Sequence, residues 1–416
     1  MQTPYKRLTA ETLPAYLATI PGLQARLGTP ASVRAREVSD GNMNAVHLVQ
    51  GDAGTLCVKQ ALPTVRLDES WPVPVERAAY EVAWMRAVAP HAEGRIPELY
   101  HFDPEQYVIV MENLSPHIIL RQGFIEGRRF DQAAPVVGRY VANTCFATSD
   151  LALRFEEKYA NIARFCGNTG LLRITVDLIL TDPYHDHARN RWTRPYLDAE
   201  VAALRADAAA QLGAARLGQR FLSTTQALLH GDLHSGSVMV TESDTRVIDG
   251  EFCLYGPIGF DLGAYIGNVL LAWFSQPGHE REPGERRAYQ DWLLAQIPLF
   301  WEAFRRRFLE LWSNPATGDA YAVALDASPA LRQAASRARA LFLAEIWHDA
   351  VGYAGLKMVR RLVSYAHVAD FESIADPAHR ARLEAPALRF ARRLLAEHPT
   401  IGSPEDLVAL LGGYAG

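Results

Sequence analysis

Two acidic segments near the middle of the chain limit its possible folds more than any other feature. The first is His-Gly-Asp-Leu-His-Ser-Gly-Ser at 230–237, which follows an apolar run, and the second is Asp-Gly-Glu at 249–251, which ends a short strand pattern. A hairpin of this kind brings the carboxylates of Asp232, Asp249 and Glu251 to one edge. Phosphoryl transfer from ATP uses one carboxylate for the attacking hydroxyl and others for magnesium. A metal site without ATP fits the same residues, so the hairpin alone leaves both interpretations open.

The composition excludes several classes of protein. With 416 residues, 49% of them hydrophobic, the chain is long enough for one large domain or two to three ordinary ones. The net charge of −5 comes from mixed acidic and basic residues without a basic tail, which argues against binding to nucleic acid or an anionic membrane. No stretch approaches the roughly 18 apolar residues that span a bilayer. We therefore expect a cytoplasmic protein with four buried free thiols, at Cys57, Cys145, Cys166 and Cys253.

The strand and helix patterns divide the chain into two parts. Up to Met111 the sequence predicts one main helix at Val75–Ala89 and strands at Val33–Val38, Ala45–Gln50, Thr55–Gln60 and Tyr107–Met111. After Asn113, long Ala- and Leu-rich helical patterns dominate, at 133–155, 198–229, 291–312, 331–368 and 378–397. This order predicts an α+β, bilobal fold with a β-rich N-lobe at 1–111, a hinge at 112–115 and a helical C-lobe at 116–416. Ligand pockets commonly form in the cleft between two such lobes.

The predicted N-lobe contains a turn and a lysine that suit phosphate binding. The turn at 40–44 includes Gly41 and the amide side chain of Asn42, and its backbone N–H groups can cover phosphates. Taken alone, this segment is better explained as an ordinary hairpin turn. One hairpin later, Lys59 is flanked by strand-forming apolar residues and is placed to reach the phosphates. The alternative for Lys59 is a position at the sheet edge, where its side chain points to solvent.

A lysine in this role needs a carboxylate partner. The helix predicted at 75–89 offers Glu76 and Glu81, and we prefer Glu81 because it lies in the middle of the helix, where a side chain can face the sheet. The alternative is a solvated helix charge.

Two further segments carry candidate roles. The link between the lobes is expected to bind the adenine edge through its backbone, at Glu112, Asn113 and Leu114. His230 and His234 have the spacing of a zinc-binding pair, but the turn between them is not the helix that such a pair uses. A structural role for His230 is therefore favoured.

With these residues assembled, the chain resembles the protein-kinase-like small-molecule kinases related to choline and aminoglycoside kinases, and within them the 5-methylthioribose kinases. The similarity runs nearly end to end. Besides the two acidic segments, the matching motifs lie at 40–44, 59–63, 111–115, 181–183, 255–261 and 352–370. Two features separate this subfamily from its relatives: Ser237 stands where most kinases of the fold have a magnesium-binding Asn, and the second acidic segment reads Asp-x-Glu.

The resemblance implies ATP-dependent phosphorylation of the C1 hydroxyl of 5-methylthioribose, a step of methionine salvage, in a cytoplasmic homodimer. It implies that Asp232 meets the sugar hydroxyl and that Mg²⁺ is held by Asp249 and Glu251. The residues that it implies for contact with ATP or its magnesium are Asn42, Lys59, Glu112, Asn113, Leu114, Asp249, Gly250 and Glu251. The chain departs from the family at Gly250, where Pro is usual, and at Ser235, where Thr is usual. Because Gly is less constrained than Pro, a looser spacing of the two acids is expected.

The resemblance also implies a sugar site that contains Arg360, Arg361 and Trp71. Guanidinium groups donate to sugar hydroxyls and neutralise charge on a transferred phosphoryl group. Neighbouring residues on a helix point about 100° apart, so at most one arginine is expected to face the cleft squarely. Without the resemblance, a solvated pair at a helix end is the plainer interpretation. Trp71 is expected to close over the methylthio group, and packing against its own lobe is the alternative.

Other acceptors and another class of protein fit parts of the pattern. The same chemistry on 5-deoxyribose, an aminoglycoside or an amino alcohol is the nearest alternative, although an arginine pair disfavours a cationic acceptor. A nucleotide-binding pseudokinase that acts as a regulator is disfavoured because Lys59, Asp232, Asp249 and Glu251 occur together.

Overall fold

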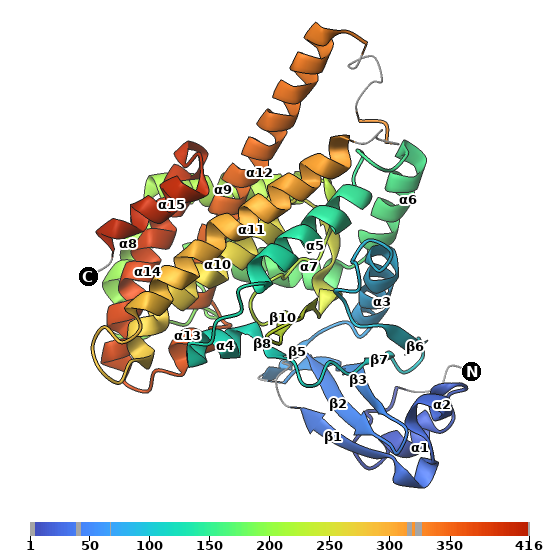
Figure 1. Ribbon diagram of the computed structural model, residues 1–416. Helices are drawn as coiled ribbons and strands as arrows, with labels where there is room; N and C mark the ends of the chain where they lie inside the picture. The colour runs from blue at the N-terminus through green and yellow to red at the C-terminus, as the bar shows by residue number, and fades with distance from the viewer. Residues whose placement is uncertain (1–4, 39–42, 67, 314–317, 321–326, 415–416) are drawn as a thin grey trace.

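The computed structural model of the chain describes residues 5–38, 43–66, 68–313, 318–320 and 327–414. A sheet-based N-lobe (α1 to β7) lies at the bottom of Figure 1, and a larger helical C-lobe (β8 to η8) lies above it. The predicted α+β, two-lobed fold is confirmed.

The N-lobe is built on an antiparallel five-stranded sheet of order β1-β2-β3-β7-β6. Its strands are β1 Arg34–Val38, β2 Asn44–Gln50, β3 Thr55–Ala61, β7 Val108–Glu112 and β6 Leu99–Asp103. We did not locate β6 from the sequence because its five residues are all half-buried and show no alternation of burial. A short hairpin, β4 Thr64–Val65 with β5 Asp68–Pro72, links β3 to the main helix α3, Arg77–Val88.

The two faces of this sheet belong to different cores. Successive side chains of a strand point to opposite faces. Leu56 and Val58 of β3 pack with the two short N-terminal helices α1 (Leu13–Leu17) and α2 (Leu23–Leu27). Ala61, two residues after Lys59, packs instead with the side chains of α3. Lys59 therefore points at α3, and its exposure of 6% excludes a solvent-facing lysine.

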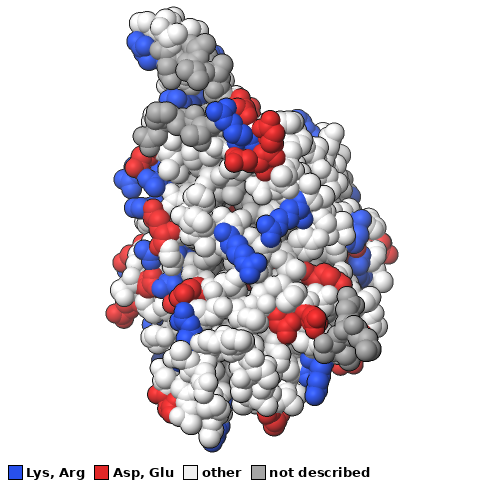
Figure 2. Space-filling view, turned by 90° about the vertical axis from the view of Figure 1, so that its right-hand side faces the viewer, with Lys and Arg blue, Asp and Glu red and all other residues white. Residues whose placement is uncertain are grey.

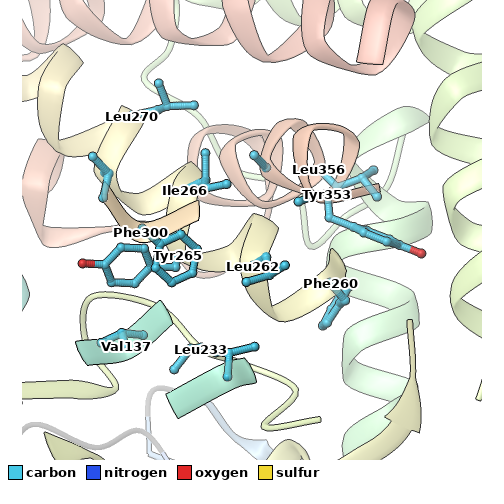
Figure 3. Packing of buried hydrophobic residues seen from close by; sticks show 14 of the residues in the cluster. Val137, Leu233, Phe260, Leu262, Tyr265, Ile266, Leu270, Phe300, Tyr353 and Leu356 are labelled. Atoms are coloured by element: carbon cyan, nitrogen blue, oxygen red, sulfur yellow. The ribbon is translucent and has the colours of Figure 1, made fainter. Parts of the chain in front are cut away.

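The C-lobe packs around α10 (Gly259–Ser275), every residue of which is buried. Its neighbours are α5 Ala133–Ala147, α11 Arg287–Ser313, α12 Pro329–Val363 and α14 Pro377–Glu397. Figure 3 shows Leu262, Tyr265 and Ile266 of α10 among the buried side chains, with Leu233 of the first acidic segment beside them. The sequence patterns missed α10 because a helix buried on all sides has no polar face.

Helices α10 and α12 approach each other closely because glycines line their contact. A Cβ atom on Gly263 would lie 2.5 Å from the backbone oxygen of Ala350, and one on Gly267 would lie 2.9 Å from that of Ala354. Such distances leave no room for a side chain. The closeness fixes α12 against the centre of the lobe.

The other C-lobe elements are shorter. The helices are α4 Leu120–Glu126, α6 Phe155–Phe165, α7 Thr169–Thr175, α8 Asp198–Ala206, α9 Ala208–Ser223, α13 Ala369–Glu372 and α15 Pro404–Leu410. Two small sheets, of order β11-β10-β8 and β12-β9, consist of β8 Ile118–Ile119, β9 Ala227–Leu229, β10 Val238–Val240, β11 Thr245–Val247 and β12 Leu254–Gly256.

Two predicted helices are divided in the structure. The helix expected at 133–155 ends at Ala147, where the hydroxyls of Thr148 and Ser149 donate to preceding backbone oxygens. The helix expected at 198–229 breaks at Asp207, whose side chain caps α9, and its last residues form β9.

The N-terminal part of α12, orange in Figure 1, projects from the body of the C-lobe. Acidic and basic side chains are interspersed on the face shown in Figure 2. No helix in the described ranges is long and apolar enough to cross a membrane.

Candidate active site

An ion-pair cluster links the N-lobe to the second acidic segment. The ammonium Nζ of Lys59 lies 2.8 Å from Oε1 of Glu81 and also contacts the carboxylate of Asp249. Glu81 reaches the lysine because it faces the sheet from the middle of α3, where it is 2% exposed. Burial opposes ionisation of Asp249, but the charge of Lys59 outweighs it and lowers the pKa of Asp249. The structure thus brings together Lys59, Glu81 and Asp249.

Glu251 is held from two sides by N-lobe residues: Arg77, which the sequence analysis missed, and Asn44, the last residue of the turn predicted at 40–44. Arg77, at the start of α3, donates from Nε to Glu251 at 3.0 Å, and the amide of Asn44 donates to both carboxylate oxygens at 3.1 and 3.2 Å. Arg77 also donates to the backbone oxygens of Leu62 and Pro74. Its partners lie far apart in the sequence, so no local pattern marked it.

The carboxylates of Glu81, Asp249 and Glu251 each offer an oxygen within 4.8 Å of the other two. Hard oxygen donors of this kind fit a divalent cation such as magnesium. Between the two segment acids, Gly250 lies against the indole of Trp84, and a Cβ atom there would fall 2.3 Å from that ring. Asn42 lies outside the residues that the structure describes.

Asp232 lies in the C-lobe, in the first acidic segment. Its Oδ1 accepts from Nζ of Lys357 at 3.0 Å, and its Oδ2 lies 3.2 Å from Nε2 of His234. Burial would raise the pKa of Asp232, but Lys357 and His234 outweigh burial and hold that pKa well below its ordinary value. Asp232 is therefore an anion at neutral pH.

The backbone around Asp232 is held by side chains from several elements. Asp261, at the start of α10, accepts from the N–H groups of His230 at 2.7 Å and Gly231 at 2.9 Å. The ring of His230 uses both nitrogens within the segment, since Nε2 donates to the oxygen of Ile248 and Nδ1 accepts from the N–H of Asp232. This arrangement gives His230 a structural role, as favoured from the sequence. Ser237 Oγ donates to the backbone oxygen of Asp232 at 2.9 Å.

The link between the lobes is tied to β11. The carboxylate of Glu112 accepts from Arg246 at 3.1 Å, and its backbone N–H donates to the oxygen of Glu98 at 2.9 Å, so both of these groups are occupied. The side chain of Asn113 accepts from the N–H of Ser115. Leu114 is buried.

Arg360 and Arg361, near the end of α12, are 7% and 8% exposed, which excludes a solvated helix-end pair. Arg361 donates weakly to the oxygen of Ala366, at 3.4 Å. Within the described part of the chain, Nε and Nη1 of Arg360 have no hydrogen-bond partner. The charge of Arg360 also contributes to the low pKa of Asp232. Arg360 is therefore the arginine with free donors beside the carboxylate.

A third arginine, Arg121 of α4, lies near Arg360 and Arg361 and was missed from the sequence. Its Nε lies 3.4 Å from the carboxylate of Asp370, and its Nη2 donates to Asn268 at 3.2 Å. Its position near Asp232 depends on two contacts that no sequence pattern marks: β8 pairs with β10, directly after the first acidic segment, and the backbone N–H of Arg121 donates to the oxygen of Ser235.

Trp71 lies on β5, and its ring contacts residues of the C-lobe as well as residues of its own lobe. The ring centroid lies 5.3 Å from that of Tyr365 in an edge-to-face arrangement, and the guanidinium of Arg189 lies 5.2 Å from the indole. Because Tyr365 follows Arg361 closely in the chain, Trp71 is brought near the arginine pair.

Known proteins share this architecture and sequence. A sequence profile of the family described as "Phosphotransferase enzyme family" matches residues 34–300. A methylthioribose kinase of Escherichia coli is 43% identical over 395 residues, which cover 94% of this chain and 94% of that protein. Methylthioribose kinase 2 of Oryza sativa is 39% identical over 412 residues, covering 98% and 96%. A solved glucosamine kinase, in complex with glucosamine, ADP and inorganic phosphate, shares the fold with a TM-score of 0.52 at 14% identity, over 92% of this chain and 86% of that one. The chain therefore belongs to the methylthioribose kinase family and is a phosphotransferase that acts on a hydroxyl group.

Proposed function

We propose that the protein transfers the γ-phosphoryl group of ATP to the C1 hydroxyl of 5-methylthioribose and so acts in methionine salvage. The observation that carries this proposal is the pairing, in one buried region, of ionised Asp232 with the unpartnered guanidinium donors of Arg360. An anionic carboxylate can orient a hydroxyl, and free guanidinium donors can meet the other sugar oxygens or the incoming phosphoryl group. The relatives named methylthioribose kinases support this acceptor.

On the nucleotide side, Lys59 holds the α- and β-phosphates, and Glu81 keeps its ammonium in place. Asp249 and Glu251 hold Mg²⁺, which neutralises charge on the phosphates when it is bound. The backbone of Glu112, Asn113 and Leu114 binds the adenine edge, and the backbone at Gly250 and the side chain of Asn42 complete the ATP contacts. The close packing of Gly250 on Trp84 supports a fixed position for both neighbouring acids.

On the acceptor side, Asp232 orients the C1 hydroxyl. As the hydroxyl oxygen bonds to the γ-phosphorus and the bond to ADP breaks, the hydroxyl proton passes to Asp232 and then to water. Arg360 and Arg361 bind the sugar and the transferred phosphoryl group, and Trp71 covers the methylthio group. The transition state of such transfers is loose, so positioning and charge neutralisation supply most of the rate.

We extend the proposal to the organisation of the protein: an N-lobe at 1–111, a hinge at 112–115 and a C-lobe at 116–416, in a cytoplasmic homodimer. Light scattering at several protein concentrations tests the dimer, because a mass near 46.1 kDa would identify a monomer instead.

The purified protein with Mg-ATP and a panel of acceptors tests the activity. The panel contains 5-methylthioribose, 5-deoxyribose, ribose, choline and an aminoglycoside. We expect the highest kcat/KM for 5-methylthioribose, with one phosphate per sugar at C1 by ³¹P NMR. Phosphorylation of choline or the aminoglycoside in preference to every ribose would overturn the proposed acceptor. ATP binding without any transfer would favour a regulatory pseudokinase.

A further inference from the structure

One buried lysine contacts the proposed base and has no role in the function described so far. Lys357 lies on α12, and its Nζ donates to Oδ1 of Asp232 at 3.0 Å. The lysine is 2% exposed, and its ammonium also lies 4.3 Å from the centre of the Phe260 ring. A buried ammonium is costly unless a carboxylate pairs with it, so this contact is the main compensation for placing a charge there.

The position of Lys357 follows from the helix that carries it. Arg360 and Arg361 come three and four residues later, and residues with this spacing share a face of an α-helix. Gly263 and Gly267 of α10 pack closely on Ala350 and Ala354 of α12, which precede Lys357 by seven and three residues. The ammonium therefore reaches Asp232 from a rigid element rather than from a loop.

The two oxygens of Asp232 are held differently. Oδ1 meets the full charge of Lys357, whereas Oδ2 lies 3.2 Å from Nε2 of His234. Burial lowers the pKa of His234 to about 3, so this ring is neutral. Its Nδ1 accepts from the N–H of Gly236 at 3.0 Å, which makes Nε2 the donor to Asp232. Each carboxylate oxygen thus has one donor and keeps a lone pair for a hydroxyl.

The choice of lysine at this position is unusual for the chain. Of its 42 lysine and arginine residues, only four are lysines: Lys6, Lys59, Lys158 and Lys357. The other cations of the acceptor site are arginines. A lysine ammonium is a compact point charge that fits against one oxygen, whereas a guanidinium fork spreads over two. A compact charge on Oδ1 leaves Oδ2 accessible to the acceptor.

We propose that Lys357 is a positioning residue of the transfer reaction, which fixes the Asp232 carboxylate as an anion in one orientation toward the acceptor hydroxyl. This inference rests on the proposed function of Asp232. Lys357 acts through the carboxylate and does not have to touch the sugar itself.

The charges around Asp232 determine how its pKa changes when Lys357 is replaced by a neutral residue. Burial would raise the pKa of Asp232, and Lys357 is the largest of the charges that oppose it. The other charged or titratable groups that face this region are His234, Arg121, Arg360, Arg361, Asp249, Asp261 and Asp370. Asp232 acts as an anion, so it functions at pH values above its pKa. As the pH falls through this pKa, the carboxylate is protonated and the function is lost. Without Lys357 this loss should begin at a higher pH.

The test compares the pH profile of kcat in wild-type protein and in Lys357→Met, with 5-methylthioribose and Mg-ATP both saturating. Loss of an adjacent opposite charge shifts a carboxylate pKa by roughly 1–3 units. We expect the acidic limb of kcat to move up by at least about one pH unit in Lys357→Met, with kcat at pH 7 reduced at least about tenfold. The KM for ATP should change less than about threefold, because the nucleotide contacts lie elsewhere.

A matched control separates this effect from the loss of any buried lysine. Lys158 of α6 is buried and pairs with Asp150 at 3.4 Å, on a helix that contributes nothing to the proposed site. Lys158→Met should leave the acidic limb of kcat where it is in the wild-type protein. Lys357→Arg keeps the charge and should retain a wild-type limb even if its kcat is lower.

Two results would overturn the inference. One is a Lys357→Met variant that is folded and active with an unmoved acidic limb. The other, which applies even if Lys357→Met does not fold, is a Lys357→Arg variant whose acidic limb shifts upward although the charge is retained. Wild-type protein that ignores 5-methylthioribose would instead refute the proposed acceptor, and the same profiles would then be measured with whichever acceptor of the panel is phosphorylated.

Discussion

Substituting Gly250 by alanine tests whether the packing of Trp84 holds the second acidic segment. The added Cβ atom would lie 2.3 Å from Cε3 and 2.4 Å from Cδ2 of Trp84. Carbon atoms in contact are about 3.5–4.0 Å apart, so the overlap exceeds about 1 Å. Trp84 cannot yield easily, since it is 2% exposed and packs edge-to-face on His230 at 5.2 Å. Overpacking of this kind costs about 1–3 kcal/mol.

The cost should appear both in stability and in turnover. At about 2 °C per kcal/mol for a large domain, Gly250→Ala should lower Tm by roughly 2–6 °C. Because Asp249 and Glu251 flank the altered residue, kcat with Mg-ATP should fall as well. Gly412→Ala is the matched control, because a Cβ atom at Gly412 meets nothing within 4 Å. Its Tm and kcat should equal those of the wild-type protein.

A double-mutant cycle identifies the cause. Trp84→Leu removes the ring that the new Cβ atom strikes, so Gly250→Ala should cost about 1–3 kcal/mol less in that background. Gly250→Pro introduces the residue that is usual in the family. We expect this substitution to be tolerated only in the Trp84→Leu background. The reasoning is wrong if Gly250→Ala matches the control, or if the two substitutions are additive in Tm and kcat.

Three further predictions concern the charged residues. Asp232→Asn should lower kcat at least about a hundredfold with little change in ATP affinity. If the variant instead lost ATP binding but kept normal turnover per bound ATP, Asp232 would be a nucleotide ligand. Asp249→Ala and Glu251→Ala should each raise the Mg²⁺ concentration needed for half-maximal rate, and full activity would remove that residue from the metal site. Arg360→Ala should raise KM for methylthioribose and lower kcat more than Arg361→Ala does. ATP binding, measured by calorimetry, should stay unchanged in both variants. Normal sugar kinetics in both variants would place the acceptor site elsewhere.

The part of the site that could be predicted from the sequence depends on local periodicity. Lys59 lies in a strand whose alternate side chains face different cores, and Glu81 lies in the middle of the only helix expected in that lobe. The strand position of Lys59, the mid-helix position of Glu81 and the need of such a lysine for a carboxylate partner therefore sufficed to predict this pair. The roles of the individual site residues stay predictions until they are tested.

The missing parts depend on contacts between segments far apart in the chain. Arg77 meets Glu251 across 174 positions and Lys357 meets Asp232 across 125, so neither pair leaves a local signal. Lys357 could have been suspected from its spacing of three and four residues to the arginine pair, since these positions share a helix face. Helix α10 was missed for the opposite reason, because complete burial removes the polar positions that reveal periodicity.

The glycine-lined contact between α10 and α12 determines where harmful substitutions can occur. Asp261 of α10 holds the backbone before Asp232, and Gly263 and Gly267 of the same helix set the distance to α12 and its three cations. The separation between the proposed base and its cations is thus fixed in the interior of the C-lobe, away from any substrate. Substitution of Gly263 by a larger residue would move α12 and its cations relative to Asp232. It would therefore lower activity although Gly263 itself lies outside the active site. A survey of variants that considered only ligand contacts would overlook it.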